Sequence, residues 1–497
     1  MRKKKLFLNT GAAVVKEIVT IVCGFVLPRY IIGFYGSEVN GLVSSITQFL
    51  GFISFLEMGI GPVIQSNLYK PLAKKDNDQI SRIIVSANRF FRRLSCILIG
   101  YIIVLICIFS FIVDGKFEIA FTTALIISIG FNIFSQYYFG ITNQLLLNAD
   151  QKGYVQMMLS VTSLLISTFL SVTIMKLGGS IQLVKLSTSI VYLIRPVGQN
   201  LYIKKHYKIN KHIKYEEEPI KQKWNGFAQH VAAVITGNTD VTILTLFSTL
   251  GNVSVYTVYF NIVNGISNAV LTLATGLEAF WGNMIANHEN DHLLNTFMFI
   301  EWAFHYLCTI LFSITAILIV PFIRIYTNGI TDENYVVPLF SLILVLAYYM
   351  FCLRVPYFRI IKAAGHYKQT QNGAIINASL NIVISIVLVI KLGIIGVAVG
   401  TLVAMTFHTC YFVWYLSKNI LNRRIAYFIK HIVVDLISFG VFGFLGNRIS
   451  IQGISYYDWV VLAIKEAILS VFVVTCFNIL PYKSYIVYGI KKIRKGG

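Results

Sequence analysis

About fourteen hydrophobic segments, each long enough to cross a lipid bilayer, follow one another along this chain of 497 residues. Crossing the hydrocarbon core takes roughly 20 apolar residues, and only short polar stretches separate the segments. The composition agrees, because 56% of the residues are hydrophobic and only 13% are charged, about half the charge of a soluble domain. The sequence therefore predicts an all-α polytopic membrane protein that acts within or across the membrane.

Hydropathy places the expected helices between short polar connections, with the longest hydrophilic segment at residues 204–224. This segment is mixed in charge and follows the sixth helix, so we interpret it as a linker between two lobes. The expected helices lie near residues 6–34, 40–67, 88–113, 118–147, 153–175, 181–203, 225–248, 253–285, 295–324, 335–362, 369–391, 394–418, 429–448 and 457–480.

An internal repeat supports two lobes. A shift of 215 residues carries Lys176-Leu177-Gly178 onto Lys391-Leu392-Gly393, and both tripeptides lie between the fifth and sixth helices of a lobe. A repeat of six helices inserts twice in the same orientation, so the lobes are expected to be parallel, related by a pseudo-twofold axis along the membrane normal. We expect six-helix lobes at residues 1–214 and 215–430, then two added helices and a basic tail at residues 431–497.

The net charge of +21 is concentrated at the ends of the hydrophobic segments. Basic residues cluster at the N-terminus, at residues 70–93, 204–223 and 418–430, and at the C-terminus. With an even number of spans these clusters share one side, which the positive-inside rule assigns to the cytoplasm. We therefore expect a multi-pass protein of the bacterial cytoplasmic membrane with both termini inside. Nucleic-acid binding is not expected, since no basic patch is interleaved with exposed aromatic residues on a soluble unit.

Ionisable residues inside the hydrophobic segments are the first candidates for function, because each costs about 2.5–3.5 kcal/mol at the centre of a span. Lys16 lies roughly 15 Å into the first helix, near mid-membrane. Glu57 precedes the run Gly59-Ile60-Gly61-Pro62, which should kink or unwind the second helix. Asp240 and Arg354 lie within the seventh and tenth helices. These four residues line a wet central cavity or, alternatively, form buried pairs between helices without touching substrate.

Arginines nearer the helix ends have an alternative interpretation that involves no function. Arg29 and Arg195 lie close enough to the membrane interface to reach it with their side chains. Lys16 has a structural alternative too, as a charge compensated locally by its neighbour Glu17.

Signals for catalysis are missing from the sequence. The nine histidines are scattered, and no His-x-x-x-His or Glu-x-x-His spacing suggests a metal site. No phosphate-binding Gly-x-x-x-x-Gly-Lys-Ser/Thr loop occurs. The seven cysteines all lie in apolar segments without ligand spacing. We therefore expect no enzyme activity, no metal and no cofactor.

Several motifs together resemble one transporter family. Arg29 to Gly41 closes the first helix, and Leu56-Glu57-Met58-Gly59-Ile60-Gly61 ends the second. Asp240 to Leu244, followed by Gly251 and Tyr256, resembles that family's seventh-helix signature. With fourteen helices, the chain resembles the Wzx-like polysaccharide flippases of the multidrug/oligosaccharidyl-lipid/polysaccharide (MOP) exporter superfamily, which have a MATE-like fold.

This resemblance implies a flippase that moves undecaprenyl-pyrophosphate-linked oligosaccharides from the cytoplasmic to the outer leaflet by alternating access of the lobes. The implied partners are this glycan, the bilayer, and the polysaccharide polymerase and glycosyltransferases. The last two helices would offer a groove for the prenyl tail. The implied substrate-binding residues are Lys16, Arg354, Arg29, Asn238 and Gln48, and those implied for coupling to H⁺ or Na⁺, or for gating, are Glu57 and Asp240.

Three alternatives remain. A lipid II-type flippase also has fourteen helices, but its arginine- and phenylalanine-rich signature around the second helix is not seen. A multidrug antiporter of the superfamily usually has twelve. A membrane-embedded glycan polymerase would normally need a large outer loop, and the expected outer connections here are about ten residues or fewer.

Overall fold

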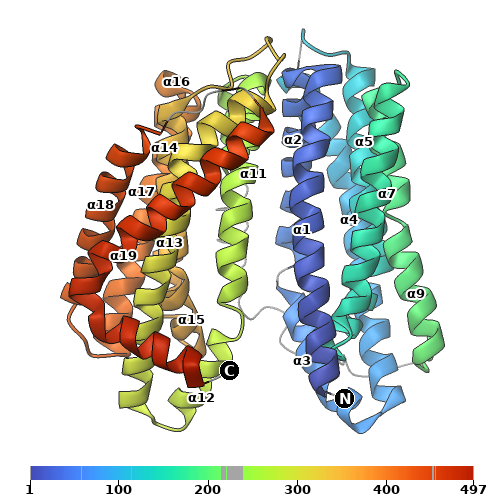
Figure 1. The fold of residues 1–497 in the computed structure, drawn as a ribbon. Coiled ribbons are helices and arrows are strands. Elements are labelled where there is room, and N and C mark those ends of the chain that lie inside the picture. The colour runs from blue at the N-terminus through green and yellow to red at the C-terminus, as the bar shows by residue number, and fades with distance from the viewer. Residues whose placement is uncertain are drawn as a thin grey trace. The chain divides into compact units, whose positions relative to one another are not determined.

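All regular structure in the described residues is helical. The structure, a computed structural model, describes residues 2–57, 59–113, 115–213, 220, 239–449, 453 and 455–495. Within them, 11 helices are long and apolar enough to cross a membrane, or 12 if one bent pair counts as a single span. The predicted all-α membrane fold class is confirmed. The chain divides into two compact units, Met1–Leu246 and Phe247–Gly497, both drawn in Figure 1.

The expected boundary near residue 214 and the expected seventh helix fall largely outside the described residues. Of that helix, residues 239–247 are described, and they are helical. The lobe boundary stays a prediction.

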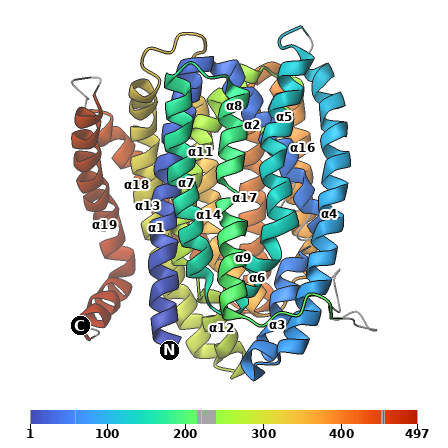
Figure 2. The ribbon, with the colours of Figure 1, turned by 90° about the vertical axis from the view of Figure 1, so that its right-hand side faces the viewer.

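The N-terminal unit is a bundle in which α1 packs on α2 and α7, while α5 packs on α4 and α8. Figure 2 shows α8 and α9 following each other from one end of this unit to the other. Its elements are α1 (Arg2–Tyr35), α2 (Ser37–Gly51), the 3-10 helix η1 (Phe52–Glu57), α3 (Ile60–Lys74), α4 (Asn77–Ile112), α5 (Ile119–Ser135), the π-helix η2 (Gln136–Gly140), α6 (Ile141–Ala149), α7 (Gly153–Lys176), α8 (Ile181–Val191) and α9 (Ile194–His206).

The second helix of this unit is interrupted where the sequence predicts a kink. It tightens into η1, and Gly59 then adopts a left-handed conformation with φ 69° before α3 begins. Glycine suits this position because it has no Cβ to clash there. The fourth helix is interrupted by η2, whose wider turns shift the side chains that follow it. Polar side chains lie at both interruptions, Glu57 at the end of η1 and Gln136 at the start of η2.

The C-terminal unit has its own bundle and two added helices. In the bundle α17 packs on α14 and α16, whereas α18 and α19 pack on each other and on α13. The last helix, α19, crosses the unit obliquely (Figure 1) and kinks at Tyr482, after Pro481. The elements are α11 (Leu250–Leu273), α12 (Leu277–Ala286), α13 (Asn290–Tyr326), α14 (Pro338–Leu353), α15 (Val355–Ala363), α16 (Gln371–Leu392), α17 (Ile394–Asn419), α18 (Ala426–Gly446) and α19 (Tyr456–Lys495).

Elements α2 to α7 and elements α11 to α16 show the same order of continuous and broken helices, but the next helix is broken between α8 and α9 in the N-terminal unit and continuous, as α17, in the C-terminal unit. The break between α11 and α12 contains Gly276, with φ 95°, as the break before α3 contains Gly59. The fourth helix is also broken in both units, within 119–149 and between α14 and α15. Backbone breaks at membrane depth occur where the chain is buried in protein or lines a polar cavity.

Candidate functional site

A polar cavity of about 380 Å³ lies inside the N-terminal unit. Its charged lining residues are Lys16 from α1, Glu57 from the end of η1, and Arg195 from α9. The structure thus brings Lys16 and Glu57 together, and it adds Arg195. Four side-chain amides complete the polar lining, those of Gln136, Gln144, Gln156 and Gln199.

The interrupted helices hold two of the charged groups in place. Tyr137, on η2, donates a hydrogen bond to Glu57 Oε1. Arg195 Nε donates to Ser163 Oγ at 2.7 Å, and its guanidinium lies 4.3 Å from the centre of the Tyr192 ring. Arg195 therefore lines the cavity, where position alone had suggested that it reaches the membrane interface.

Lys16 has no hydrogen bond or ion pair with any described residue, and Glu17 does not pair with it. The cavity wall also contains Gln199 Oε1, a buried acceptor without a described hydrogen-bond partner. Two cations face one carboxylate here, so the charged lining is formally positive. Such a cavity suits an anionic or hydroxyl-rich group that can satisfy the free ammonium.

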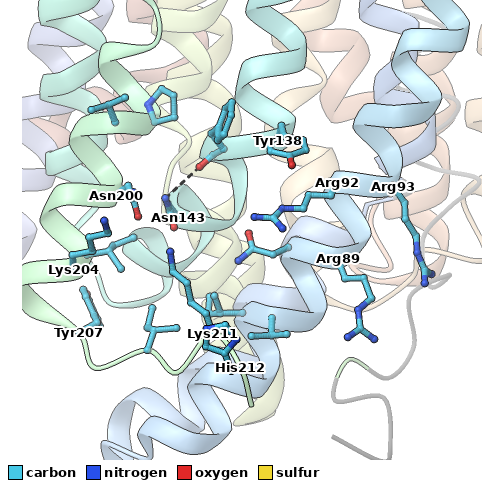
Figure 3. Close-up of a pocket in the computed structure, with 18 of the residues that line it drawn as sticks. Arg89, Arg92, Arg93, Tyr138, Asn143, Asn200, Lys204, Tyr207, Lys211 and His212 are labelled. Carbon is cyan, nitrogen blue, oxygen red and sulfur yellow. Dashed lines mark hydrogen bonds between the residues drawn. The ribbon is translucent and has the colours of Figure 1, made fainter. Parts of the chain in front are cut away.

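A second and larger pocket, of about 1200 Å³, lies between α4 and α9 of the same unit. Figure 3 shows Arg92 and Lys211 extending into this space, whereas Arg93 points away from α9. Among the described residues that line it, none is an aspartate or a glutamate. We call it the basic pocket, after its lining residues Arg89, Arg92, Arg93, Lys204, Lys208, Lys211 and His212.

Aromatic and amide groups accompany these cations. The Arg92 guanidinium lies 5.1 Å from the centre of the Tyr138 ring, a cation–π contact that helps to orient it. Asn143 donates to the Phe139 carbonyl oxygen at 3.3 Å, and Asn88 and Asn200 offer further amides. Guanidinium and ammonium donors suit phosphate oxygens, and amides with an aromatic face suit sugars.

Asp150 ties the wall of the basic pocket to α1. It accepts hydrogen bonds from Tyr207 at 2.5 Å and Lys5 at 3.2 Å, and pairs with Lys152 at 2.8 Å. Partial burial opposes the charge, but these hydrogen bonds and Lys152 hold the pKa of Asp150 below its usual value. Burial and the neighbouring carboxylate raise the pKa of Tyr207.

The remaining predicted site residues are spread over both units. Arg29 and Gln48 are half-buried on α1 and α2, and Asp240 is 9% exposed in the helical stretch 239–247. Asn238 lies outside the described residues. The roles predicted for these residues stay predictions.

Arg354 lies at the break between α14 and α15 of the C-terminal unit. Its Nη1 contacts His408 Nδ1, and its guanidinium lies 5.0 Å from the centre of the Phe351 ring. Among the described residues no carboxylate pairs with Arg354.

Sequence reasoning missed two groups of residues. The basic pocket was treated only as part of the cytoplasmic charge bias, although three arginines at residues 89–93 occur within one helix. The buried Glu301 and Asp435 were not singled out, although both lie in apolar helices. The rule that selected Lys16, an ionisable group inside a span, would have found them.

Solved structures of similar fold include a lipid II flippase and multidrug transporters. No family model matches the sequence, and no curated protein does. The lipid II flippase MurJ in an inward closed conformation has a TM-score of 0.71 at 16% identity, covering 97% of this chain and 100% of that one. A multidrug resistance MATE family transporter of the MOP superfamily has TM-scores of 0.68 in its inward-facing conformation and 0.58 in its outward-facing one.

The two MATE structures are 11% and 12% identical to this chain. They cover 81% and 84% of it, and 94% and 95% of their own chains. At these identities the likeness shows the fold alone. The chain therefore has the fold of MOP transporters, and the lipid II flippase matches it over nearly its whole length.

Proposed function

We propose that the chain is a flippase for undecaprenyl-pyrophosphate-linked oligosaccharide repeat units in surface polysaccharide biosynthesis. It would move them from the cytoplasmic to the outer leaflet of the bacterial cell membrane by alternating access. The observation that carries the proposal is the basic pocket, where seven basic side chains line a space of about 1200 Å³ without a described carboxylate. A diphosphate is the part of this substrate that most needs such an environment, because its charge is prohibitively expensive in hydrocarbon.

The position of the basic pocket fits capture of a membrane lipid. Its lining includes the last residues of α9. Figure 2 shows the end of α9 at the same end of the N-terminal unit as the N-terminus and the start of α4, the end that the charge bias predicts to be cytoplasmic. A diphosphate in the cytoplasmic leaflet can bind Arg92, Lys204 and Lys211, while the first sugars contact Tyr138 and the pocket's amides. The volume is generous for this purpose, because ligand pockets are typically about 300–1000 Å³.

The cavity around Lys16 is the proposed second contact for the diphosphate. Its volume of about 380 Å³ can hold a phosphate group and its nearest waters but not an oligosaccharide. Lys16 supplies an ammonium with no described partner, and Arg354 remains a proposed substrate contact. Arg29, Asn238 and Gln48 remain proposed contacts, and Glu57 and Asp240 remain proposed sites for H⁺ or Na⁺.

Two features support alternating access and a lipid-linked cargo. MATE transporters of similar fold are known in inward-facing and outward-facing conformations. The two helices α18 and α19 follow the expected second six-helix lobe, and we propose that they guide the prenyl tail. Glycosyltransferases would supply the cargo and a polymerase would consume it. The full-length match to a lipid II flippase makes a lipid II-type substrate the second candidate.

Deletion of the gene tests the substrate. Complete lipid-linked repeat units should accumulate in the cytoplasmic leaflet, because the protein would normally move them to the outer leaflet. Accumulation of the peptidoglycan precursor instead would favour the lipid II alternative. Units that reach the outer leaflet and stay unpolymerised would favour a polymerase. Altered sensitivity to cationic drugs without a glycan defect would favour an antiporter.

Two arginines of α4, Arg92 inside the pocket and Arg82 outside it, offer a matched test. Arg92→Glu should lower flipping of the lipid-linked unit by about 10- to 100-fold, the loss expected for one charge-assisted hydrogen bond of about 1.5–3 kcal/mol. Arg82→Glu makes the same charge change on an exposed arginine of α4 that does not line the pocket, and should change flipping less than threefold. Equal losses in the two variants, at equal membrane abundance, would remove the basic pocket from the substrate path.

A further inference from the structure

A second group of titratable residues lies buried in the C-terminal unit, whereas the basic pocket and the Lys16 cavity belong to the N-terminal unit. Asp435 on α18 is 3% exposed and His305 on α13 is 2% exposed. His305 Nδ1 lies 2.5 Å from Asp435 Oδ2, and the Tyr349 hydroxyl donates to the same oxygen at 2.7 Å. The pair thus joins one of the added helices to the bundle.

This pair continues into a second carboxylate through stacked rings. His431, one turn before Asp435 on α18, stacks on His305 with ring centres 4.7 Å apart. His431 Nε2 lies 3.9 Å from Glu301 Oε2. Glu301 is itself bound by Arg423, whose Nη2 donates to Oε1 at 2.6 Å. Two buried carboxylates are therefore linked by two imidazoles.

The charges balance only if the network holds one proton. Arg423 neutralises Glu301, but no described lysine or arginine pairs with Asp435. With both histidines neutral, one uncompensated negative charge remains in the membrane, which costs several kcal/mol. Protonation of both would place two like charges at the 4.7 Å ring separation. One shared proton is the state of lowest charge.

The other groups that face the network do not supply this missing charge. The tyrosines and cysteines are neutral, and Lys430 is engaged elsewhere, since it donates to the Pro481 carbonyl oxygen at 3.2 Å and lies over the Tyr482 ring. The facing groups are Cys308 on α13, Tyr349 and Cys352 on α14, Tyr357 on α15, Lys430 on α18, and Tyr482 and Tyr485 on α19.

One ring nitrogen is placed to receive the proton. His305 Nδ1 faces the carboxylate, so in the neutral ring Nδ1 carries the hydrogen and Nε2 keeps its lone pair. His305 Nε2 is buried and has no described hydrogen-bond partner. A proton arriving from water forms an N–H bond there and leaves an imidazolium beside Asp435, with no other bond broken.

We propose that His305 and Asp435 form a proton-binding site that takes up one proton and couples it to transport. Because α18 contributes Asp435 and α13 contributes His305, occupancy sets how tightly the added helices are held on the bundle. The coupling rests on the proposed function, whereas the proton occupancy does not.

Proton occupancy can be measured on the purified full-length protein without any substrate. In protein labelled with ¹⁵N-histidine, the resonance that disappears in His305→Gln should titrate between pH 5 and pH 9. In Asp435→Asn its midpoint should fall by at least one pH unit, because the stabilising carboxylate is gone. Glu466→Gln is the matched control, a carboxyl on α19 that is fully buried and has no described hydrogen-bond partner. It should leave the midpoint unchanged.

The outcomes separate this proposal from the proposed function. If His305→Gln does not fold, the double variant His305→Gln/Asp435→Asn, a neutral pair, serves for the assignment. The proton site would be overturned, whatever the substrate is, if the His305 resonance stays constant from pH 5 to pH 9. It would also be overturned if the midpoint of the His305 titration is unchanged in Asp435→Asn.

Coupling is tested in proteoliposomes with undecaprenyl pyrophosphate carrying one fluorescent sugar. An imposed pH gradient should drive its flipping by the wild type and by Glu466→Gln but not by Asp435→Asn. If the gradient drives Asp435→Asn as strongly as the wild type, or drives neither, the coupling role is overturned, while the titration still decides the proton site.

Discussion

The buried ion pair between Arg423 and Glu301 gives the sharpest energetic prediction. Its side chains are 2% and 1% exposed, and the guanidinium binds both carboxylate oxygens. Burial disfavours the charge on Arg423, but Glu301 raises its pKa above the usual value, so the guanidinium stays charged. Arg423→Ala would leave Glu301 charged and buried, with the Tyr357 hydroxyl as its main hydrogen-bond donor.

Removing one partner of a buried pair costs about 3–5 kcal/mol in free energy of unfolding. At about 1.4 kcal/mol for each factor of ten, Arg423→Ala should lower the folded-to-unfolded ratio by about 10²- to 10⁴-fold. The pair of Arg359 with Glu278 is the internal control, because its atoms are 3.5 Å apart and its side chains are 24% and 37% exposed. Arg359→Ala should cost about 0–1 kcal/mol.

Denaturant unfolding of the purified variants in detergent micelles measures these differences. Glu301→Gln combined with Arg423→Ala should recover most of the loss, because no buried charge is then left unpaired. The reasoning is refuted if Arg423→Ala costs no more than Arg359→Ala, or if the double variant is no more stable than Arg423→Ala.

Three further predictions follow from the N-terminal unit. Lys16→Ala should abolish flipping at normal membrane abundance, and Lys16→Arg should retain part of the flipping activity. If Lys16→Ala instead lowers abundance and the double variant Lys16→Ala/Glu17→Ala restores both abundance and flipping, the two residues form a structural pair. Single-cysteine labelling should find positions near Lys205 inaccessible to an impermeant reagent outside intact cells, and labelling there would overturn the predicted topology. Because the pKa of Asp150 is lowered, its stabilising contacts should be complete at neutral pH and lost as pH falls below about 4; acid unfolding of Asp150→Asn should lack this component, and an unchanged acid profile would contradict it.

Features that depend on local sequence were predicted well. A run of about 20 apolar residues specifies a membrane helix wherever it occurs, because the bilayer demands an internally hydrogen-bonded backbone. The break between η1 and α3 also followed from local chemistry, since Gly59 and Pro62 disfavour a continuous helix. The expected seventh helix lies mostly outside the described residues, so no comparison applies to it.

Partnerships between side chains depended on the tertiary structure. Lys16 and Glu17 are adjacent in sequence but do not pair, because neighbouring positions on a helix point about 100° apart. The cavity instead brings Lys16 together with Glu57 and Arg195. These side chains line it because η1 packs on α2 and α9 packs on α7, the two helices on which α1 packs.

The sequence by itself determined that this chain is a bundle of membrane helices, which of its segments carry basic charge, and which ionisable residues lie at membrane depth. Only the tertiary structure decided which of them meet. His305 and Asp435 are 130 positions apart, yet their side chains are 2.5 Å apart. Hydropathy is summed along one segment, whereas a charge pair forms across the interface between helices, and the packing that creates the interface involves many residues at once.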